Sequence, residues 1–425
     1  MYSYIDFLEQ YGRIMQFNKN KTEPFHRWYP FVEGYSKEFI QSIIQEMNKS
    51  ALICLEPFSG SGTTALELQN LGIECYSFEV NPLMYLIARV KLEKVYMVEE
   101  VNKWFEFICK TRNGNIIVNL KSEFKTLYQN DGKEKWNYNN SVAIAIEKLQ
   151  YVIGMITDNI YKELFLVALA AILLDVSNLY RNGKCLSYKK NWKDRSIAEQ
   201  EVYQYFDNKV KNELIPDIQN SLNRKLQVNN KNKLFNIDSR VGIEEKIKDE
   251  TIDLVITSPP YLNSRDYTDT YMLELKTLGF TNSNEEIRNL REKTVRSHVQ
   301  IKWQDSTSIN NIKLNETLKE LENAAESKTI WNKSIIDMIR LYFVDMKKIF
   351  NVIYRKLKKG GRVYFNVSNS AYFDVLVNTL EICASIAEDE GYRVLEIRKA
   401  RYLKTSPQQK EAIGSLLEGV IVLEK

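Results

Sequence analysis

Short apolar runs and longer helical periodicities alternate along the chain in a regular order. Residues 51–92 begin with an apolar run and a Gly/Ser loop, followed by an amphipathic segment closed by Gly72 and a second apolar run. In letters these are ALICLEP, FSGSGTT, ALELQNLG and ECYSFEVNP. This order predicts strand, loop, helix and strand, which is typical of the first unit of a parallel βαβ sheet.

The second half of the chain repeats this alternation. Strands are predicted at KLFNID, TIDLVITS and RVYFNVS, a long helix at SIIDMIRLYFVDMKKIFNVIYRKLKKGG, and a closing pair of strands at RVLEIRK and GVIVLEK. Strands that alternate with helices predict an α/β fold.

Two stretches interrupt the α/β pattern. Between about residues 94 and 233 helical periodicities replace the strand signals, and residues 281–335 are mostly polar. No linker rich in Gly, Ser or Pro bounds the first stretch, so we expect a helical insertion packed on the core. The predicted units are therefore 1–93, 94–233, 234–280, 281–335 and 336–425.

The composition limits the class of protein and the kinds of site that the chain can contain. The chain has 425 residues, 44% hydrophobic and 27% charged, and can bury a sizeable core. Its longest apolar run, Leu164 to Leu174, is too short to span a bilayer, and no signal-like apolar segment opens the chain. We therefore expect a cytoplasmic protein. Five scattered cysteines and two histidines argue against disulfide frameworks, metal clusters and Ser-His-Asp triads.

The net charge of +4 conceals a basic segment. Residues 181–233 hold 12 Lys and Arg against 6 Asp and Glu, a local net charge of +6. In its densest part Tyr180, Tyr188 and Trp192 are interleaved with basic residues. Cations beside aromatic rings suit a polyanion with stackable bases, and a solvated basic face of the helical insertion is the alternative.

A glycine loop and two carboxylates predict a cofactor site. Gly60, Gly62 and Ala65 fit the pattern G-x-G-x-x-[GA] between the first strand and its helix. Glu79, at the end of the second strand, can accept both hydroxyl hydrogens of a ribose. Glu56, at the end of the first strand, disfavours phosphate and favours a cationic ligand. Unless these carboxylates only cap helices or pair with lysines, a ribose-bearing cationic cofactor such as S-adenosylmethionine fits best.

The stretch DLVITSPPYLNSRDY holds the second candidate site. Its two prolines cannot continue a sheet ladder, so the strand is expected to stop at Thr257. A stiff loop then lies at the carboxyl end of a strand, where open α/β sheets hold their ligands.

Together, EPFSGSGTT and TSPPY resemble motifs I and IV of the S-adenosylmethionine-dependent DNA amino-methyltransferases, which methylate N4 of cytosine or N6 of adenine. FEVNP resembles motif II, NIDSR motif III, and FHRWYPFVEGYSKEFI the segment that closes over the methionine end of the cofactor. The resemblance covers residues 25–92, 234–280 and 336–425. It departs from the family at Glu56, where Asp is commoner, and in the large insertion that precedes the motif III candidate.

The resemblance implies a Rossmann-like class I methyltransferase fold, a seven-stranded, mostly parallel sheet with one antiparallel strand near its end. It also implies S-adenosylmethionine as cofactor, with Glu79 on the ribose and Asp238 near the adenine amine. The implied cofactor-binding residues are Tyr29, Pro30, Glu56, Pro57, Phe58, Ser59, Gly60, Ser61, Gly62, Thr63, Thr64, Glu79, Val80, Asn81, Asp238 and Ser239.

The TSPPY loop supplies the candidate catalytic residues Ser258, Pro259, Pro260 and Tyr261. Ser258 Oγ and the Pro259 carbonyl can accept the two hydrogens of an exocyclic amine. Tyr261 can stack on a base rotated out of the duplex, unless it packs on the core. Asp266, Tyr267 and Tyr271 either shape the base pocket or only pack. Candidate DNA contacts in the insertions are Arg181, Lys184, Lys189, Lys190, Lys193, Arg291 and Arg296.

The leading hypothesis is a DNA N4-cytosine methyltransferase of a restriction-modification or related defence system, because Ser at the head of this loop goes most often with that base in the family. Its expected partners are double-stranded DNA and a cognate endonuclease, without a metal or a membrane. Residues 94–233 are the candidate target-recognition region, and residues 281–335 are expected to contact DNA. The alternatives are adenine N6, an amine in structured RNA, and a nucleic-acid-binding protein with a degenerate cofactor fold.

Overall fold

An eight-stranded sheet forms the centre of the computed structural model, which describes residues 2–48, 52–130, 132–183, 185–223, 232–263, 266–327, 332, 334–405 and 409–425. The strands are β1 (Tyr4–Asp6), β2 (Ile53–Glu56), β3 (Glu74–Phe78), β6 (Lys233–Phe235), β7 (Ile252–Thr257), β8 (Leu357–Ser368), β11 (Arg393–Lys404) and β12 (Ser415–Glu424). Their order is β1-β11-β12-β8-β7-β2-β3-β6.

The sheet is mostly parallel, as the sequence predicts. Strand β12 is antiparallel to both of its neighbours, β11 and β8, while the other neighbouring pairs are parallel. The predicted closing hairpin and the antiparallel strand near the end of the sheet are therefore confirmed. The sheet has one strand more than the expected seven, because the short β1 adds to the edge beside β11.

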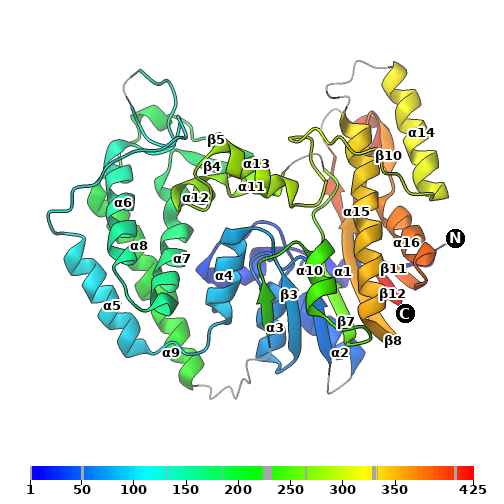
Figure 1. Cartoon of the computed structure of the whole chain (residues 1–425), viewed down its shortest axis with the longest axis horizontal. Helices are drawn as coiled ribbons and strands as arrows, with labels where there is room; N and C mark the ends of the chain where they lie inside the picture. Colours follow the sequence, from blue (N-terminus) through cyan, green and yellow to red (C-terminus); the bar gives the residue numbers. More distant parts are fainter. Residues whose placement is uncertain are drawn as a thin grey trace.

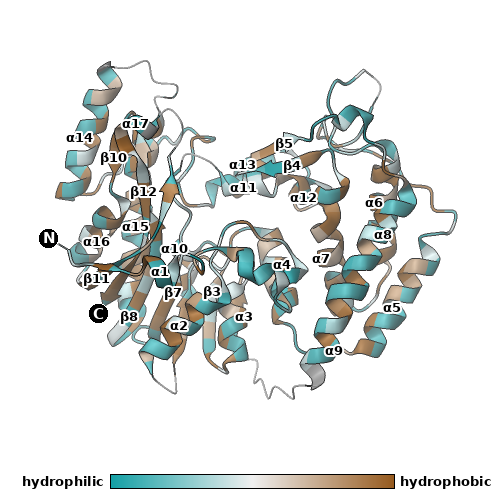
Figure 2. Ribbon diagram, turned by 180° about the vertical axis from the view of Figure 1, so that it is seen from behind, coloured by the Kyte–Doolittle hydropathy of each residue, from teal (hydrophilic) through white to brown (hydrophobic). Residues whose placement is uncertain are grey.

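Helices cover both faces of this sheet (Figure 1). One face packs against α1 (Leu8–Tyr11), α2 (Lys37–Met47) and α3 (Thr63–Asn70), and the other against α10 (Ser239–Lys246), α15 (Ser334–Lys356) and α16 (Thr379–Asp389). Neighbouring residues of β7 face opposite sides: Ile256 belongs to the first core and Val255 to the second. Figure 2 shows part of the resulting apolar interior, with β7 coloured mostly as hydrophobic.

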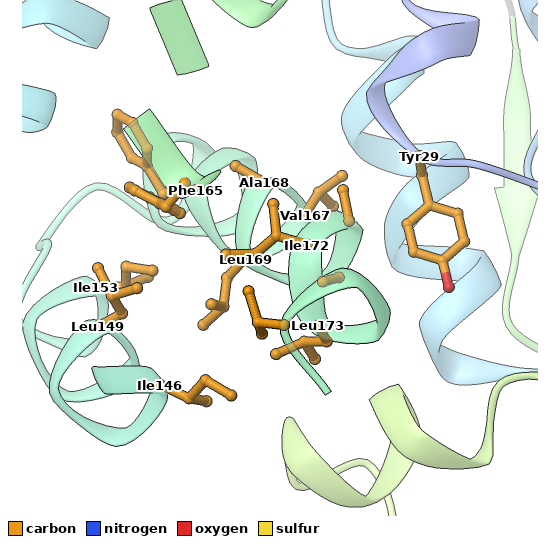
Figure 3. Packing of buried hydrophobic residues seen from close by; sticks show 14 of the residues in the cluster. Tyr29, Ile146, Leu149, Ile153, Phe165, Val167, Ala168, Leu169, Ile172 and Leu173 are labelled. Carbon is orange, nitrogen blue, oxygen red and sulfur yellow. The ribbon is translucent and has the colours of Figure 1, made fainter. Parts of the chain in front are cut away.

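The region between β3 and β6 forms a helical unit beside the sheet (Figure 1). It follows α4 (Pro82–Leu92) and consists of α5 (Val98–Thr111), α6 (Asn140–Gly154), α7 (Asn159–Val176), β4 (Leu179–Asn182), β5 (Cys185–Tyr188), η3 (Trp192–Asp194), α8 (Glu199–Lys209), the π-helical turn η4 (Val210–Leu214) and α9 (Ile215–Asn223). Helix α7 is buried on nearly all sides and packs against α6 through residues such as Leu149 and Leu169 (Figure 3). The antiparallel β4–β5 hairpin was not predicted, because the sequence pattern indicated helices only.

The remaining elements belong neither to the central sheet with its covering helices nor to the helical unit. They are η1 (Phe17–Thr22), η2 (His26–Trp28), α11 (Tyr267–Thr270), α12 (Met272–Thr277), α13 (Asn284–Glu292), α14 (Ile312–Ser327), β9 (Ser370–Tyr372), β10 (Val375–Val377) and α17 (Lys410–Ile413). Helices α11 to α13 lie between the helical unit and the C-terminal part of the sheet (Figure 1). No helix in the described ranges combines the length and apolar character that crossing a membrane requires.

Two buried carboxylates fasten the helical unit to the rest of the protein. Asp217 of α9 accepts hydrogen bonds from the backbone N of Phe25 (2.9 Å), the guanidinium of Arg27 (2.6 Å) and Nε1 of Trp28 (2.9 Å). Glu274 of α12 forms an ion pair with Arg181 of β4. Because Asp217 is 1% exposed, its bonds hold residues 25–28, the start of the predicted cofactor-closing segment, in a fixed position.

Candidate active site

The carboxyl ends of four parallel strands meet at one edge of the sheet and border a cavity of about 1290 Å³. The segments that follow β2, β3, β7 and β8 line it through residues 57–60, 79–81, 258–263 and 368–372. The N-terminal segment 30–35 lines it as well. The glycine loop and the Pro-Pro loop, which the sequence singled out separately, therefore share one cavity.

Glu79 holds the glycine loop in place. Its Oε2 accepts from the backbone N of Gly60 at 2.7 Å, and its Oε1 accepts from the backbone N of Asn81 at 2.8 Å. Asn81 in turn caps α4 by accepting from the backbone N of Leu83. Burial raises the pKa of Glu79 to about 7. A carboxylate has about four acceptor positions, so each oxygen of Glu79 keeps room for a further hydrogen bond from a ligand.

Glu56 has a structural position rather than a place in the cavity wall. Its carboxylate accepts from Thr257 Oγ1 at 2.6 Å, from the hydroxyls of Tyr35 and Thr64 at 2.8 Å each, and from the backbone N of Phe58. Burial raises the pKa of Glu56 to about 7. These bonds join the ends of β2 and β7, so Glu56 fixes the floor of the site without facing a ligand.

Tyr29, Ser61 and Gly62 also lie outside the cavity lining, whereas the other predicted cofactor residues are in it. Tyr29 is buried and donates its hydroxyl to Glu274. Gly62 has φ of 84°, and a Cβ there would lie 2.8 Å from the Cβ of Ala88. This glycine serves the packing of α3 on α4 rather than the approach of a ligand.

Asp238, Ser59 and Gly60 differ in the hydrogen-bonding groups that they leave available to a ligand. Both carboxylate oxygens of Asp238 are bonded to Arg240, so an adenine amine would share an acceptor that is already engaged. The hydroxyl of Ser59 lines the cavity and has no hydrogen-bond partner among the described residues. Gly60 is covered by Phe31, whose Cζ would lie 2.9 Å from a Cβ at this position. A ribose-bearing ligand thus finds free acceptors on Glu79 and a free hydroxyl on Ser59.

The Pro-Pro loop is anchored through the hydroxyl of Tyr261. This hydroxyl donates to Glu418 Oε1 at 2.8 Å, and it accepts from Asn366 Nδ2 at 2.7 Å and from Ser258 Oγ at 3.4 Å. Burial, with the Glu418 carboxylate nearby, holds the pKa of Tyr261 well above its usual range. The hydroxyl therefore stays protonated as a donor, and the half-buried ring is held at the cavity wall.

Three predicted pocket residues line the cavity, each with a structural partner. Asp266 caps α11 through the backbone N of Thr268, and Tyr267 Oη accepts from the backbone N of Tyr261. The ring of Tyr271 lies parallel to that of Phe31, with centroids 5.9 Å apart. These residues both pack and shape the pocket, so the two alternatives do not exclude each other.

Most of the predicted DNA-contacting cations have partners within the protein. Arg181 pairs with Glu274, Arg291 with Asp266 and Asp269, and Arg296, which is 6% exposed, with Asp345 and Asp305. Lys189 Nζ donates to the carbonyls of Leu174, Asp175 and Ser177 at the end of α7. Lys190 and Lys193 are exposed, and Lys184 lies outside the described residues.

The sequence reasoning missed the C-terminal wall of the cavity. Asn366 of β8 and Glu418 and Arg401 of the β11–β12 hairpin all line it. Arg401 pairs with Glu418, which is 1% exposed. These residues stand 105 to 157 positions after Tyr261, and no motif marks them, so only the strand order brings them together. No cluster of three or more potential metal ligands occurs within the described ranges.

The sequence is similar to known Type II methyltransferases. No protein-family model matches the chain. It is 26% identical to Type II methyltransferase M.BsoBI from Geobacillus stearothermophilus, over 97% of this chain and 88% of that protein. It is 27% identical to Type II methyltransferase M.AvaI from a Nostoc species, over 91% and 82% of the two chains. A solved SAM-dependent methyltransferase from Methanosarcina mazei aligns over 90% of this chain and 96% of its own, with 8% identity and a TM-score of 0.29.

Proposed function

We propose that this protein transfers a methyl group from S-adenosylmethionine to the exocyclic N4 amine of cytosine in double-stranded DNA, as the modification enzyme of a restriction-modification system. One observation carries the proposal: the Glu79 loop and the Ser258–Tyr261 loop line one cavity at the same edge of the sheet. The similarity to Type II methyltransferases over nearly the whole chain supports it.

The residues around the cavity divide the work between holding the cofactor and holding the base. Bound S-adenosylmethionine supplies an electrophilic methyl group on a sulfonium. Glu79 and Ser59 would hold its ribose side. Ser258 Oγ directs its hydrogen toward Tyr261, which leaves its lone pairs as acceptors for an amine hydrogen. Together with the Pro259 carbonyl it would hold the amine in line for transfer.

Methyl transfer from isotope-labelled S-adenosylmethionine to DNA and to RNA tests this function directly. The products are digested to nucleosides and separated by mass. We expect N4-methylcytosine in duplex DNA. N6-methyladenine alone overturns the base assignment, label in RNA alone overturns the substrate, and no transfer to either overturns the function.

Cofactor affinity should depend on Glu79. Glu79→Ala removes two charge-assisted hydrogen bonds to the ribose, on the order of 1.5 to 3 kcal/mol each. Because the folded carboxyl has a pKa of about 7, it becomes protonated as the pH falls through this value and loses acceptor capacity. We therefore expect affinity in the wild type to rise from pH 6 to pH 8, and this pH dependence to disappear in Glu79→Ala.

Isothermal calorimetry with S-adenosylmethionine measures both effects. Glu74→Ala is a matched control. Glu74 begins β3, whereas Glu79 directly follows the other end of this strand. Glu74 does not line the cavity and pairs with Lys233. Equal affinity for Glu79→Ala and the wild type would remove Glu79 from the cofactor site.

DNA affinity should depend on the exposed cations of the basic segment. Replacing Lys190 and Lys193 with alanine is expected to weaken binding to any duplex and to flatten the salt dependence by up to about 0.9 per lost phosphate contact. Lys189→Ala is the control, since Lys189 is bound to backbone carbonyls and should affect stability instead. Binding titrations at several salt concentrations measure the slope, and an unchanged slope in the double variant marks the segment as a solvated face.

A further inference from the structure

Asn366 stands at the cavity end of β8, beside the Pro-Pro loop. It is 2% exposed and lines the cavity. Its side chain and that of Ser258 share one neighbour, the hydroxyl of Tyr261. Asn366 is not part of any motif recognised in the sequence.

The orientation of the Asn366 amide follows from its partners. Nδ2 donates to Tyr261 Oη at 2.7 Å and to Glu418 Oε1 at 3.2 Å. The Glu418 carboxylate can only accept, and Arg401 occupies its other oxygen. Tyr261 Oη gives its own hydrogen to Glu418 and must therefore accept from Asn366. The NH2 group is thus fixed toward this pair, and Oδ1 faces away from it.

Oδ1 of Asn366 has no hydrogen-bond partner within the part of the chain that the structure describes. It is buried and accepts no hydrogen bond among the described residues. Because a buried carbonyl oxygen without a donor is costly, an unpaired oxygen on a residue that lines the cavity points to a donor on a ligand. Glu418 and Tyr261 prevent the amide from rotating to avoid this position.

We propose that Asn366 Oδ1 accepts a hydrogen bond from the exocyclic amine of the target base, and thereby selects amine-bearing over carbonyl-bearing bases. The inference rests on the proposed function and adds a specificity-determining residue to it. Ser258 Oγ, the Pro259 carbonyl and Asn366 Oδ1 then offer three acceptors for two amine hydrogens. A base with a carbonyl at the same place, such as uracil in place of cytosine, meets three lone-pair groups and no donor. Glu418 acts as a positioning residue, because it fixes the amide through the bond to Nδ2.

The experiment uses a duplex that contains the site methylated by the wild-type protein, identified by sequencing of methylated plasmid DNA. A second duplex carries the carbonyl analogue of the target base, uracil for cytosine or hypoxanthine for adenine. The ratio of the two dissociation constants measures discrimination. We expect Asn366→Ala to reduce this ratio about tenfold and to leave the dissociation constant of S-adenosylmethionine unchanged.

Two further variants separate recognition from folding. Asn369→Ala removes another asparagine of the cavity wall, whose Oδ1 already accepts from the backbone N of Leu380; it should lower stability and keep the ratio. Glu418→Gln allows the Asn366 amide to rotate and should reduce the ratio even if Asn366→Ala does not fold.

The outcomes distinguish the two proposals. An active wild type whose discrimination survives both Asn366→Ala and Glu418→Gln overturns the role of Asn366 alone. A wild type that methylates neither DNA nor RNA overturns the proposed function itself.

Discussion

Replacing Ser258 with alanine is expected to slow methyl transfer roughly 100- to 1000-fold, while the protein still binds S-adenosylmethionine. The hydroxyl is a preorganised acceptor, and loss of one such polar contact costs about 2.7 to 4 kcal/mol of transition-state stabilisation. Only one oxygen is removed, and the anchor of the loop, Tyr261 to Glu418, remains intact. The defect should therefore lie in the chemical step.

Single-turnover kinetics with saturating DNA measure this step, and calorimetry measures cofactor binding. Ser42→Ala is a suitable control, because Ser42 lies on α2, donates to the carbonyl of Phe39 and does not line the cavity. Full activity in Ser258→Ala would exclude the hydroxyl from the mechanism, and a loss of cofactor affinity would place it in the cofactor site instead.

The largest loss of stability is expected for Asp345→Ala. Asp345 of α15 is completely buried and accepts from Arg240 Nη1 at 2.8 Å and from Arg296 Nη2 at 2.7 Å. Removing this carboxylate leaves two guanidinium groups without their buried counter-charge, which typically costs about 3 to 5 kcal/mol. Arg240 also pairs with Asp238. Removal of Asp345 should therefore also disturb Asp238, on the predicted adenine side of the cavity.

Urea denaturation of Asp345→Ala and the wild type measures the free energy of unfolding. Asp337→Ala provides the comparison on the same helix, since Asp337 is 60% exposed and its pair with Arg340 should contribute less than about 1 kcal/mol. If both variants unfold at similar urea concentrations, the Asp345 cluster does not stabilise the fold.

The sheet could be predicted largely because its strands carry local signals. Apolar runs of strand length, the end of β7 at Thr257 before two prolines, and the β11–β12 pair all follow from the sequence pattern. The β4–β5 hairpin could not, because its two strands are four residues each and mix aromatic with basic residues. The short β1 depends on pairing with β11, almost 400 residues away in the sequence.

The residues of the candidate site could also be predicted only where they carry a local sequence signal. Glu79 and Ser258 stand next to strands with recognisable motifs, and both line the cavity. The charge pattern could not indicate which cations pair within the protein, because an ion pair such as Arg296 with Asp345 joins segments that the sequence gives no reason to connect. Residues 366, 401 and 418 were missed for the same reason: their role depends on which strands are neighbours.

The helical unit occupies a single crossover between β3 and β6, which are neighbours in the sheet. Lengthening such a connection costs little, about 0.6 kcal/mol for each doubling of a flexible loop, and it leaves the register of the sheet unchanged. Exchange of this unit would therefore keep the order of the sheet and replace only the part of the cavity wall that Ala171, Leu174, Asp175 and Arg181 contribute. The constraint on such an exchange is specific: an incoming unit must present a buried carboxylate in the place of Asp217, which holds residues 25–28 at the start of the predicted cofactor-closing segment.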